Sequence, residues 1–378
     1  MKIRPWARGW KHLFAIVLLA SIGAAQTPVW KGKIFKDGDV TIVQNPKEPI
    51  YREPVITLKE DLVLGGGKTQ GEYAFSRARS IAVDNDGRIY VGDSQQACVK
   101  VYNKTGGYLR TIGRRGQGPG EMSWVDSVAI SHDNRELIVG DISRLIVFDL
   151  QGRFQRNIPT RGLNVATHIN GQGNVFVWIS DIRGKRSILR VFGPDMTKIL
   201  ADIAVIPDPP EPSIYMPRAH WILDSQDRLI FGYPKTYEIS LYDKHLRIEK
   251  MIRRQYVPVK VTDEDKKTYL KRSNPPGVSG PPKYPCPSVH AAFRSFFIDD
   301  LGHLFVQTWE RTSDGKKDIY DIYDPEGRFF GRIALNVHPD FINPTTRILR
   351  DNKLYATEVD EEGYEIVKRY SVVWKIGS

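Results

Sequence analysis

Short apolar segments separated by turn residues recur along the whole chain. Residues 80–126 show the pattern most clearly, with four expected strands at 81–83, 88–91, 99–102 and 108–112. Turns rich in Gly, Asn and Asp join them, so the segment is expected to form an antiparallel meander. One such sheet cannot cover its own apolar faces, so it predicts neighbouring sheets of the same kind.

The same rhythm returns five more times. The third expected strand of a unit ends in an apolar–aromatic pair, found at Val101-Tyr102, Val147-Phe148, Val191-Phe192, Leu241-Tyr242 and Ile322-Tyr323, with Tyr370 as a degenerate sixth. The first expected strand of each unit lies at 80–84, 127–131, 166–170, 220–224, 295–299 and 346–350. These first strands are apolar at both odd and even positions, which indicates sheets buried on both faces. Their spacing of about 40–55 residues is typical of propeller blades.

The sixth unit ends at its third strand, residues 366–376, with no sequence left for a fourth. Residues 54–65 read as a strand and precede the first complete unit, so they are expected to supply the missing outer strand. The sequence therefore predicts an all-β, six-bladed β-propeller of four-stranded antiparallel blades over 54–378, closed by this N-terminal strand.

Two inserts interrupt the rhythm, at 201–218 and 253–292. Within the second, Thr262 to Asp265 form a capping box that predicts a short helix over 262–272. Each insert joins an outer strand to the next inner strand, so both are expected to cover one mouth of the central tunnel. Neither has enough apolar residues for a core of its own.

Residues 1–25 have the pattern of a secretory signal peptide. Lys2, Arg4, Arg8 and Lys11 precede an apolar run at 13–22 and three small residues at 23–25. We expect cleavage after Ala25, an extension over 26–53, a mature chain without a membrane span, and a periplasmic or secreted location. An uncleaved anchor is the alternative, although the apolar run is short for a membrane crossing.

Charge and cysteine content narrow the function classes only slightly. Loss of the four basic residues and no acidic one would lower the net charge from +11 to +7. No run of Lys and Arg is interleaved with aromatic residues, which argues against nucleic-acid binding. Cys98 and Cys286 could pair in an oxidising compartment or remain separate thiols, and the sequence leaves both alternatives open.

The segments IAVDNDGRIYVGDS, VKVYNKTGGYLRTIG and GQGPGE, all within 80–126, resemble the NHL-repeat type of six-bladed propeller. The first unit departs from that repeat at Gln96 and Cys98, where the family commonly has Asn and Arg. With a WKGKI-like strand at Trp30–Phe35, the chain is also similar to exported bacterial propellers, most of them uncharacterised. The resemblance implies the fold far more strongly than an activity, because propellers host binding modules, lyases and hydrolases alike.

Candidate site residues are expected where the inner strands begin, at the mouth covered by the inserts. They are Arg77, Arg79, Trp124, Asp126, Arg218, His220, His290, Arg294 and Trp309. The arginines would suit a carboxylate or sugar-acid ligand, because guanidinium groups bind carboxylates through two hydrogen bonds. Alternatively, they pair with nearby acids such as Asp126, and both interpretations stay open.

Metal binding is a weaker hypothesis. His168, His220 and His290 come from three different units and could hold Zn²⁺, with Ca²⁺ as a second candidate ion. Their positions relative to the strands differ, however, which favours structural roles. Asp84, Asp224 and Asp299 recur directly after inner strands, where a carboxylate caps the turn.

These observations favour a binding module of the cell envelope over an enzyme, because no catalytic constellation can be named with its partners. A peptide, a glycan or an envelope protein would bind at the covered mouth, with Trp124, Tyr215 and Trp309 as exposed aromatic anchors. The alternative is a metal-dependent lyase or lactonase-like hydrolase at the same mouth.

Overall fold

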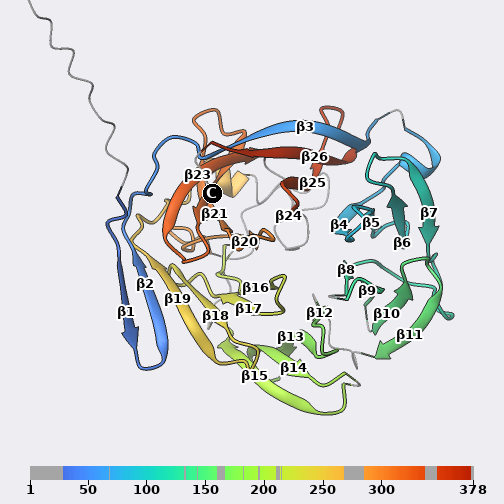
Figure 1. Cartoon of the computed structure of the whole chain (residues 1–378), viewed down its shortest axis with the longest axis horizontal. Helices are drawn as coiled ribbons and strands as arrows, with labels where there is room; N and C mark the ends of the chain where they lie inside the picture. The colour runs from blue at the N-terminus through green and yellow to red at the C-terminus, as the bar shows by residue number, and fades with distance from the viewer. Residues whose placement is uncertain are drawn as a thin grey trace, which may run out of the picture.

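Six antiparallel sheets stand like blades around a central axis (Figure 1). The structure, a computed structural model, describes residues 29–67, 69–131, 133–142, 144–159, 167–181, 183–194, 196–209, 213, 215–267, 285–336 and 347–375. The predicted fold is confirmed: there are six blades, and each is built from four antiparallel strands ordered from the axis outward.

Blade 1 contains β4 (Ala78–Val83), β5 (Ile89–Asp93), β6 (Cys98–Tyr102) and β7 (Tyr108–Ile112). Blade 2 contains β8 (Ser127–Ile130), β9 (Glu136–Gly140), β10 (Arg144–Asp149) and β11 (Phe154–Pro159). Blade 3 contains β12 (Thr167–Ile169), β13 (Val175–Asp181), β14 (Arg186–Phe192) and β15 (Ile199–Pro207). Blade 4 contains β16 (His220–Leu223), β17 (Leu229–Gly232), β18 (Glu238–Tyr242) and β19 (Ile248–Arg254). Blade 5 contains β20 (Ser295–Ile298), β21 (Leu304–Arg311), β22 (Lys317–Tyr323) and β23 (Phe329–Asn336). Blade 6 contains β24 (Arg347–Arg350), β25 (Lys353–Val359), β26 (Glu365–Trp374) and β3 (Ile56–Gly65).

The apolar–aromatic pairs that mark the third strands have a structural counterpart. In all six blades the ladder between the third and the outer strand shifts register at this pair, namely at Val101/Tyr102, Val147/Phe148, Val191/Phe192, Leu241/Tyr242, Ile322/Tyr323 and Arg369/Tyr370. Such a β-bulge bends a strand and increases its twist. The repeated pair therefore marks the point where each blade twists toward its outer edge.

The hydrophobic core is divided among the interfaces between blades. Six clusters of buried side chains are found, and each joins two neighbouring blades. In the cluster between blades 6 and 1, for example, Leu64 and Val367 pack with Ile81 and Ile89. Each blade is thus buried on both faces, as the apolar pattern of the first strands predicts.

The N-terminal strand closes the ring as expected. β3 pairs antiparallel with β26 along its length, from Gly65 opposite Ile366 to Ile56 opposite Trp374. The two lie side by side across the top of the ring in Figure 1. Blade 6 therefore joins residues near the beginning of the described chain to residues near its end.

An N-terminal strap, residues 40–55, precedes that strand and covers the outside of blades 4 and 5. β1 (Lys33–Asp37) and β2 (Val40–Asn45) form a hairpin, and β2 adds to β19 in parallel, so the sheet of blade 4 has six strands. The backbone N–H groups of Ile50 and Tyr51 then donate to the carbonyls of Phe329 and Phe330 in blade 5, at 2.9 and 3.0 Å. The strap was not expected from the sequence, which predicts only an extension with a strand at Trp30–Phe35.

A buried charge cluster lies beside the strap, between blades 4 and 5. The carboxylate of Asp321 is fully buried and accepts hydrogen bonds from Arg254 Nη1 at 2.5 Å and from the Tyr237 hydroxyl at 2.6 Å. Arg332 Nε lies 2.9 Å from the same carboxylate, and Arg254 also donates to the carbonyl of Lys47 in the strap, at 3.1 Å. Two hydrogen bonds and the positive charges of two arginines offset the cost of burying this carboxylate.

The structure shifts several expected boundaries. β15 continues to Pro207, so the first seven residues of the expected insert at 201–218 belong to the outer strand of blade 3. β19 likewise includes the first two residues of the expected insert at 253–292. Of the helix expected over 262–272, residues 263–267 are helical, residue 262 precedes the helix, and residues 268–272 lie outside the described chain.

The expected signal peptide over 1–25 also lies outside the described residues. Within the described part of the chain, no helix has the length and the apolar character that a membrane crossing requires.

Ring closure can be tested at Leu64, whose side chain is 2% exposed between blades 6 and 1. We expect Leu64→Ala to lower the free energy of unfolding by about 2–5 kcal/mol, because it leaves a cavity in that interface. Val63→Ala is the matched control: its side chain is 44% exposed on the same strand, and a change within about 0.5 kcal/mol is expected. Urea unfolding followed by tryptophan fluorescence measures both. Equal effects of the two substitutions would contradict the proposed closure.

The strap can be tested at Asn45, which is 1% exposed. Its side chain accepts the N–H of Phe329 at 2.7 Å and donates to the carbonyl of Gly327 at 2.9 Å. Asn45→Ala leaves both backbone groups unpaired, so we expect a loss of about 1–3 kcal/mol in unfolding free energy. Lys33→Ala, on the exposed strand β1, should leave stability unchanged. An Asn45→Ala variant with the melting temperature of the parent protein would show that the strap contributes nothing.

Candidate functional site

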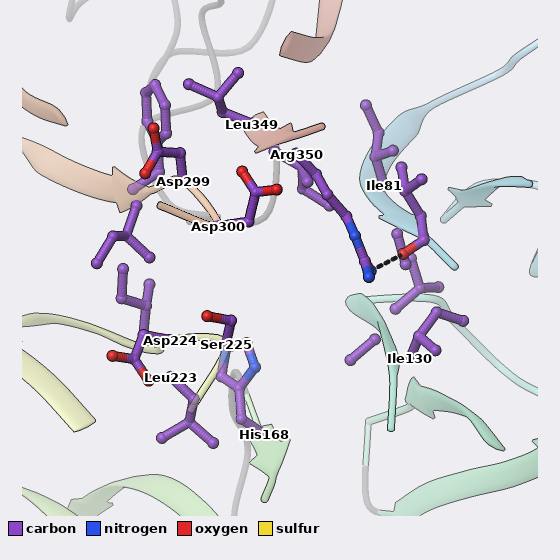
Figure 2. A pocket seen from close by; sticks show the side chains of 18 of the residues that line it. Ile81, Ile130, His168, Leu223, Asp224, Ser225, Asp299, Asp300, Leu349 and Arg350 are labelled. Atoms are coloured by element: carbon purple, nitrogen blue, oxygen red, sulfur yellow. Dashed lines mark hydrogen bonds between the residues drawn. The ribbon is translucent and has the colours of Figure 1, made fainter. Parts of the chain in front are cut away.

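A hollow of about 490 Å³ lies at the centre of the ring. All six blades line it, through the last residues of their inner strands and the turns that follow (Figure 2). The aliphatic part of the lining comprises Ile81, Val83, Val128, Ile130, Ile169, Ile222, Leu223, Ile298, Ile348 and Leu349. The hollow therefore opens at the mouth where the inner strands end, whereas the sequence placed the site at the mouth where they begin.

Polar residues from the turns surround the opening of the hollow. They are Asn85, Ser131, Asn134, Asp224, Ser225, Asp227, Asp299, Asp300, Arg350 and Asp351. Each inner strand is the edge strand of its sheet. The backbone N–H and C=O groups on its unpaired side therefore also face the central axis. The hollow combines an apolar wall with hydrogen-bonding groups, which is the usual composition of a small-molecule site.

Two of the acids at this opening have structural roles. Asp224 Oδ1 accepts the backbone N–H groups of Gln226 and Arg228, at 2.8 and 2.9 Å. Asp299 Oδ1 accepts those of Leu301 and His303, at 3.0 and 2.7 Å. Asp84 caps the corresponding turn of blade 1 in the same way. The prediction that these carboxylates cap turns is confirmed.

Other side chains at the opening join one blade to the next. Asn134 accepts the N–H of Asn85 at 2.9 Å, and Asp300 accepts that of Asp351 at 3.1 Å. Arg350 extends from blade 6 to blade 1, where its guanidinium donates to the carbonyl of Val83 at 3.0 Å (Figure 2). These contacts hold the turns in place around the opening.

The three candidate histidines have different contact partners. His168 lines the hollow and packs edge-on against Trp221 at 4.9 Å, whereas His220 is buried with Nε2 2.8 Å from the carbonyl of Phe296. His290 Nε2 lies 3.3 Å from the carboxylate of Asp265. Among the residues that the structure describes, no group of three or more His, Cys, Asp or Glu side chains is arranged to hold a metal ion.

Tyr215, His290 and Trp309 form an aromatic cluster where the two inserts meet blade 5. The His290 ring stacks on Trp309 at 4.0 Å with an interplanar angle of 7°, and Tyr215 packs edge-on against both. The Tyr215 hydroxyl donates to the carbonyl of Asp265 at 2.8 Å, which joins the first insert to the helix of the second. Trp309 and Tyr215 are half-buried in this packing and are not the exposed anchors that the sequence suggested.

Arg294 lies in the same region but points into blade 5. Its side chain is 4% exposed and pairs with the fully buried carboxylate of Asp318 at 3.0 Å. Gln307 donates to the same carboxylate oxygen at 2.6 Å. Of the two interpretations of the arginines, pairing with an acid is therefore the one that applies to Arg294. Arg218, in contrast, is exposed just before β16.

The remaining candidates lie together between blades 1 and 2. The guanidinium carbons of Arg77 and Arg79 are 5.9 and 6.0 Å from the centre of the Trp124 ring. Asp126 follows two residues later, and its backbone N–H donates to the carbonyl of Gly140 at 2.9 Å. The sequence thus identified three residues that the fold brings together at this mouth.

Except for His168, the residues that line the hollow were missed as site candidates. A signal was available, because they are the last apolar residues of the inner strands, directly before the turn. The cysteines, whose pairing the sequence left open, are separate free thiols, with Cys98 buried and Cys286 half-buried.

Buried His220 and half-buried His168 predict a loss of stability in acid. Burial lowers the pKa of both His168 and His220 to about 4, below the value of 6.5 of an exposed histidine. As the pH falls from 6.5 to 4, the unfolded chain gains protons that the folded chain does not. Each histidine should therefore lower the unfolding free energy by roughly 1.4 kcal/mol per pH unit in this window. His220→Gln removes one titrating group, so its stability should fall less steeply than that of the parent protein.

Urea unfolding at several pH values measures this slope. His245→Gln, at an exposed position, is the control and should follow the parent protein. A His220→Gln slope equal to the parent slope between pH 6.5 and 4 would contradict the buried, neutral state of His220.

Comparison with known proteins agrees with the fold. Residues 68–187 match the model of the DUF5128 family, described as a 6-bladed beta-propeller. No curated protein matches the sequence. A member of the DUF4221 family from Bacteroides vulgatus has a similar structure, with a TM-score of 0.56 and 11% identity over 84% of this chain and 99% of that one.

A Bacteroides fragilis protein named as an exported one is similar too, with a TM-score of 0.53 and 12% identity over 89% of this chain and all of that one. At these identities the similarity extends to the fold alone. The narrower resemblance to the NHL repeat has no separate support from these comparisons. The chain is thus a six-bladed β-propeller that is similar to the DUF5128 family over residues 68–187.

Proposed function

We propose that the protein is an exported binding protein of the cell envelope, which holds a small organic ligand in its central hollow. The hollow itself carries this proposal. It has about 490 Å³ of space, and residues of all six blades surround it. A volume of roughly 300–1,000 Å³ with apolar walls and a few polar groups is typical of ligand sites.

The lining indicates the character of the ligand. Half-buried side chains such as Ile130, Ile169 and Leu223 offer apolar contact area from three blades. Polar groups are concentrated at the opening, where Asp300, Asp351 and Arg350 lie. A ligand with an apolar body would pack against the wall of the hollow, and its polar substituents would reach the polar residues at the opening.

Export is supported by the pattern of residues 1–25, with a positively charged segment, an apolar run and small residues. The B. fragilis protein of similar fold is itself named as exported. A periplasmic or secreted location would give the hollow access to envelope or extracellular molecules.

The hollow can be tested with the apolar fluorescent dye Nile red. We expect saturable binding with a blue-shifted emission, because the dye would leave water for the apolar wall. Leu223→Arg places a charge on that wall and should weaken binding at least tenfold. Ser225→Trp, at an exposed turn position, narrows the opening without altering a core and should weaken binding as well.

Val205→Arg is the matched control, since Val205 is 49% exposed on the outer strand β15, far from the axis. It should leave dye binding unchanged. Binding that survives both hollow variants but is lost in Val205→Arg would place the dye on the outer surface and overturn the proposal. Melting temperatures of all variants verify that they are folded.

A further inference from the structure

A second candidate site lies at the opposite mouth, between blades 1 and 2. Arg77, Arg79 and Trp124 meet there, with both guanidinium carbons within 6.0 Å of the centre of the indole ring. We call these three residues, together with Arg115, the arginine patch. Arg77 directly precedes β4 and Arg79 is its second residue, whereas the hollow is lined by Ile81 and the residues that follow. None of the four patch residues lines the hollow, so the two sites are separate.

Two buried aspartates hold the loops that carry the patch. Asp93 is fully buried, and its carboxylate accepts the backbone N–H groups of Ser76 at 2.7 Å and Arg77 at 3.2 Å. It also accepts those of the residues at 95 and 96, at 3.1 and 2.9 Å. In blade 2, Asp141 accepts the N–H of Trp124 at 3.1 Å. The backbone of both loops is therefore fixed by equivalent contacts.

A β-bulge places Arg79. The ladder between β4 and β5 pairs Ala78 with Asp93 and Ser80 with Gly92, so Arg79 is an extra residue on β4. Bulges redirect side chains and occur often beside functional sites. Here the bulge accompanies the approach of two arginines to one tryptophan.

Arg115 joins the two loops. Its Nη2 donates to the carbonyl of Gln95 at 2.5 Å, and its Nη1 donates to that of Ser123 at 3.1 Å. Among the described residues, the guanidinium group of Arg77 contacts the Trp124 ring and that of Arg115 contacts backbone carbonyls, and neither guanidinium contacts a carboxylate. Both guanidinium groups thus keep their positive charge without a neutralising acid.

The acids near the patch do not balance its charge. The carboxylate of Asp93 is surrounded by backbone N–H groups, and that of Asp141 also pairs with Arg144 at 3.3 Å. Glu121 pairs with the neighbouring Arg114 at 2.8 Å. The guanidinium groups of Arg77 and Arg115 therefore give the patch an excess of positive charge.

We propose that the arginine patch binds a carboxylate group. A guanidinium over an indole ring is weakly hydrated and keeps its edge N–H donors available. Those donors match the two oxygens of a carboxylate, which makes a bidentate contact. The carboxylate could belong to an acidic sugar or to an acidic amino-acid side chain, because both present the same group.

Isothermal titration with sodium glucuronate and with N-acetylglutamate distinguishes the two sources, and neutral glucose is the negative control. We expect at least one of the two acids to bind, with an affinity that falls as salt is added, because the contact is ionic. Binding of glucuronate alone would identify the ligand as an acidic sugar. Binding of N-acetylglutamate alone would identify it as an acidic amino-acid side chain. Binding of neither acid would overturn the proposal.

Substitutions locate the binding. Arg77→Ala and Arg115→Ala should each weaken it at least tenfold, and Arg77→Lys should restore only part, because an ammonium group cannot make the bidentate contact. Arg218→Ala, an exposed arginine at the same mouth on blade 4, is the matched control and should bind as the parent does. Affinity unchanged in both patch variants would overturn the proposal.

Two further readouts separate this site from the hollow. Carboxylate binding should change the fluorescence of Trp124, and Trp124→Phe should remove that change. Leu223→Arg in the hollow should leave carboxylate binding intact. If Leu223→Arg abolishes carboxylate binding while Arg77→Ala does not, the carboxylate binds in the hollow and the patch is not a site.

Discussion

The antiparallel ladder between β3 and β26 is the constraint on which the rest of the ring depends. It joins residues 56–65 to residues 365–374 in one sheet. The hydrophobic core is distributed over six interfaces, so each blade needs a neighbour on both faces. Without β3, blade 6 would expose the edge of β26, and its interface with blade 1 would lose Leu64. Because this pairing needs the last strand of the chain, the ring can close only after every blade is present.

The strap adds a second long-range constraint to the same half of the ring. It lies on the outer edges of blades 4 and 5 before the chain enters blade 6. Arg254 connects the strap to the buried Asp321, and Asn45 connects it to the turn before β23. Three consecutive blades are therefore held by one N-terminal segment, while blades 1 to 3 form their sheets from consecutive strands alone.

Recurring carboxylates determine what each mouth can bind. At the mouth where inner strands end, Asp84, Asp224 and Asp299 cap turns. At the other mouth, Asp93 and Asp141 hold loops through backbone N–H groups. The oxygens of these carboxylates are occupied by backbone donors. The two proposed sites therefore use other groups, namely the apolar wall of the hollow and the guanidinium of Arg77 beside Trp124.

By itself, the sequence determined the number of blades, the order of their strands, the turn-capping aspartates and the closing strand, because each depends on local periodicity and turn chemistry. It also placed Arg77, Arg79 and Trp124 at one mouth of the tunnel, since they lie where inner strands begin. Only the tertiary structure decided that Arg294 pairs with Asp318, that β2 adds to β19, and that the hollow opens where the inner strands end. The periodicity of a strand shows only which of its side chains share a face of the sheet. The contacts of β2 with a strand about 200 residues away, and the space left at the axis by six packed blades, arise only when the whole ring is assembled.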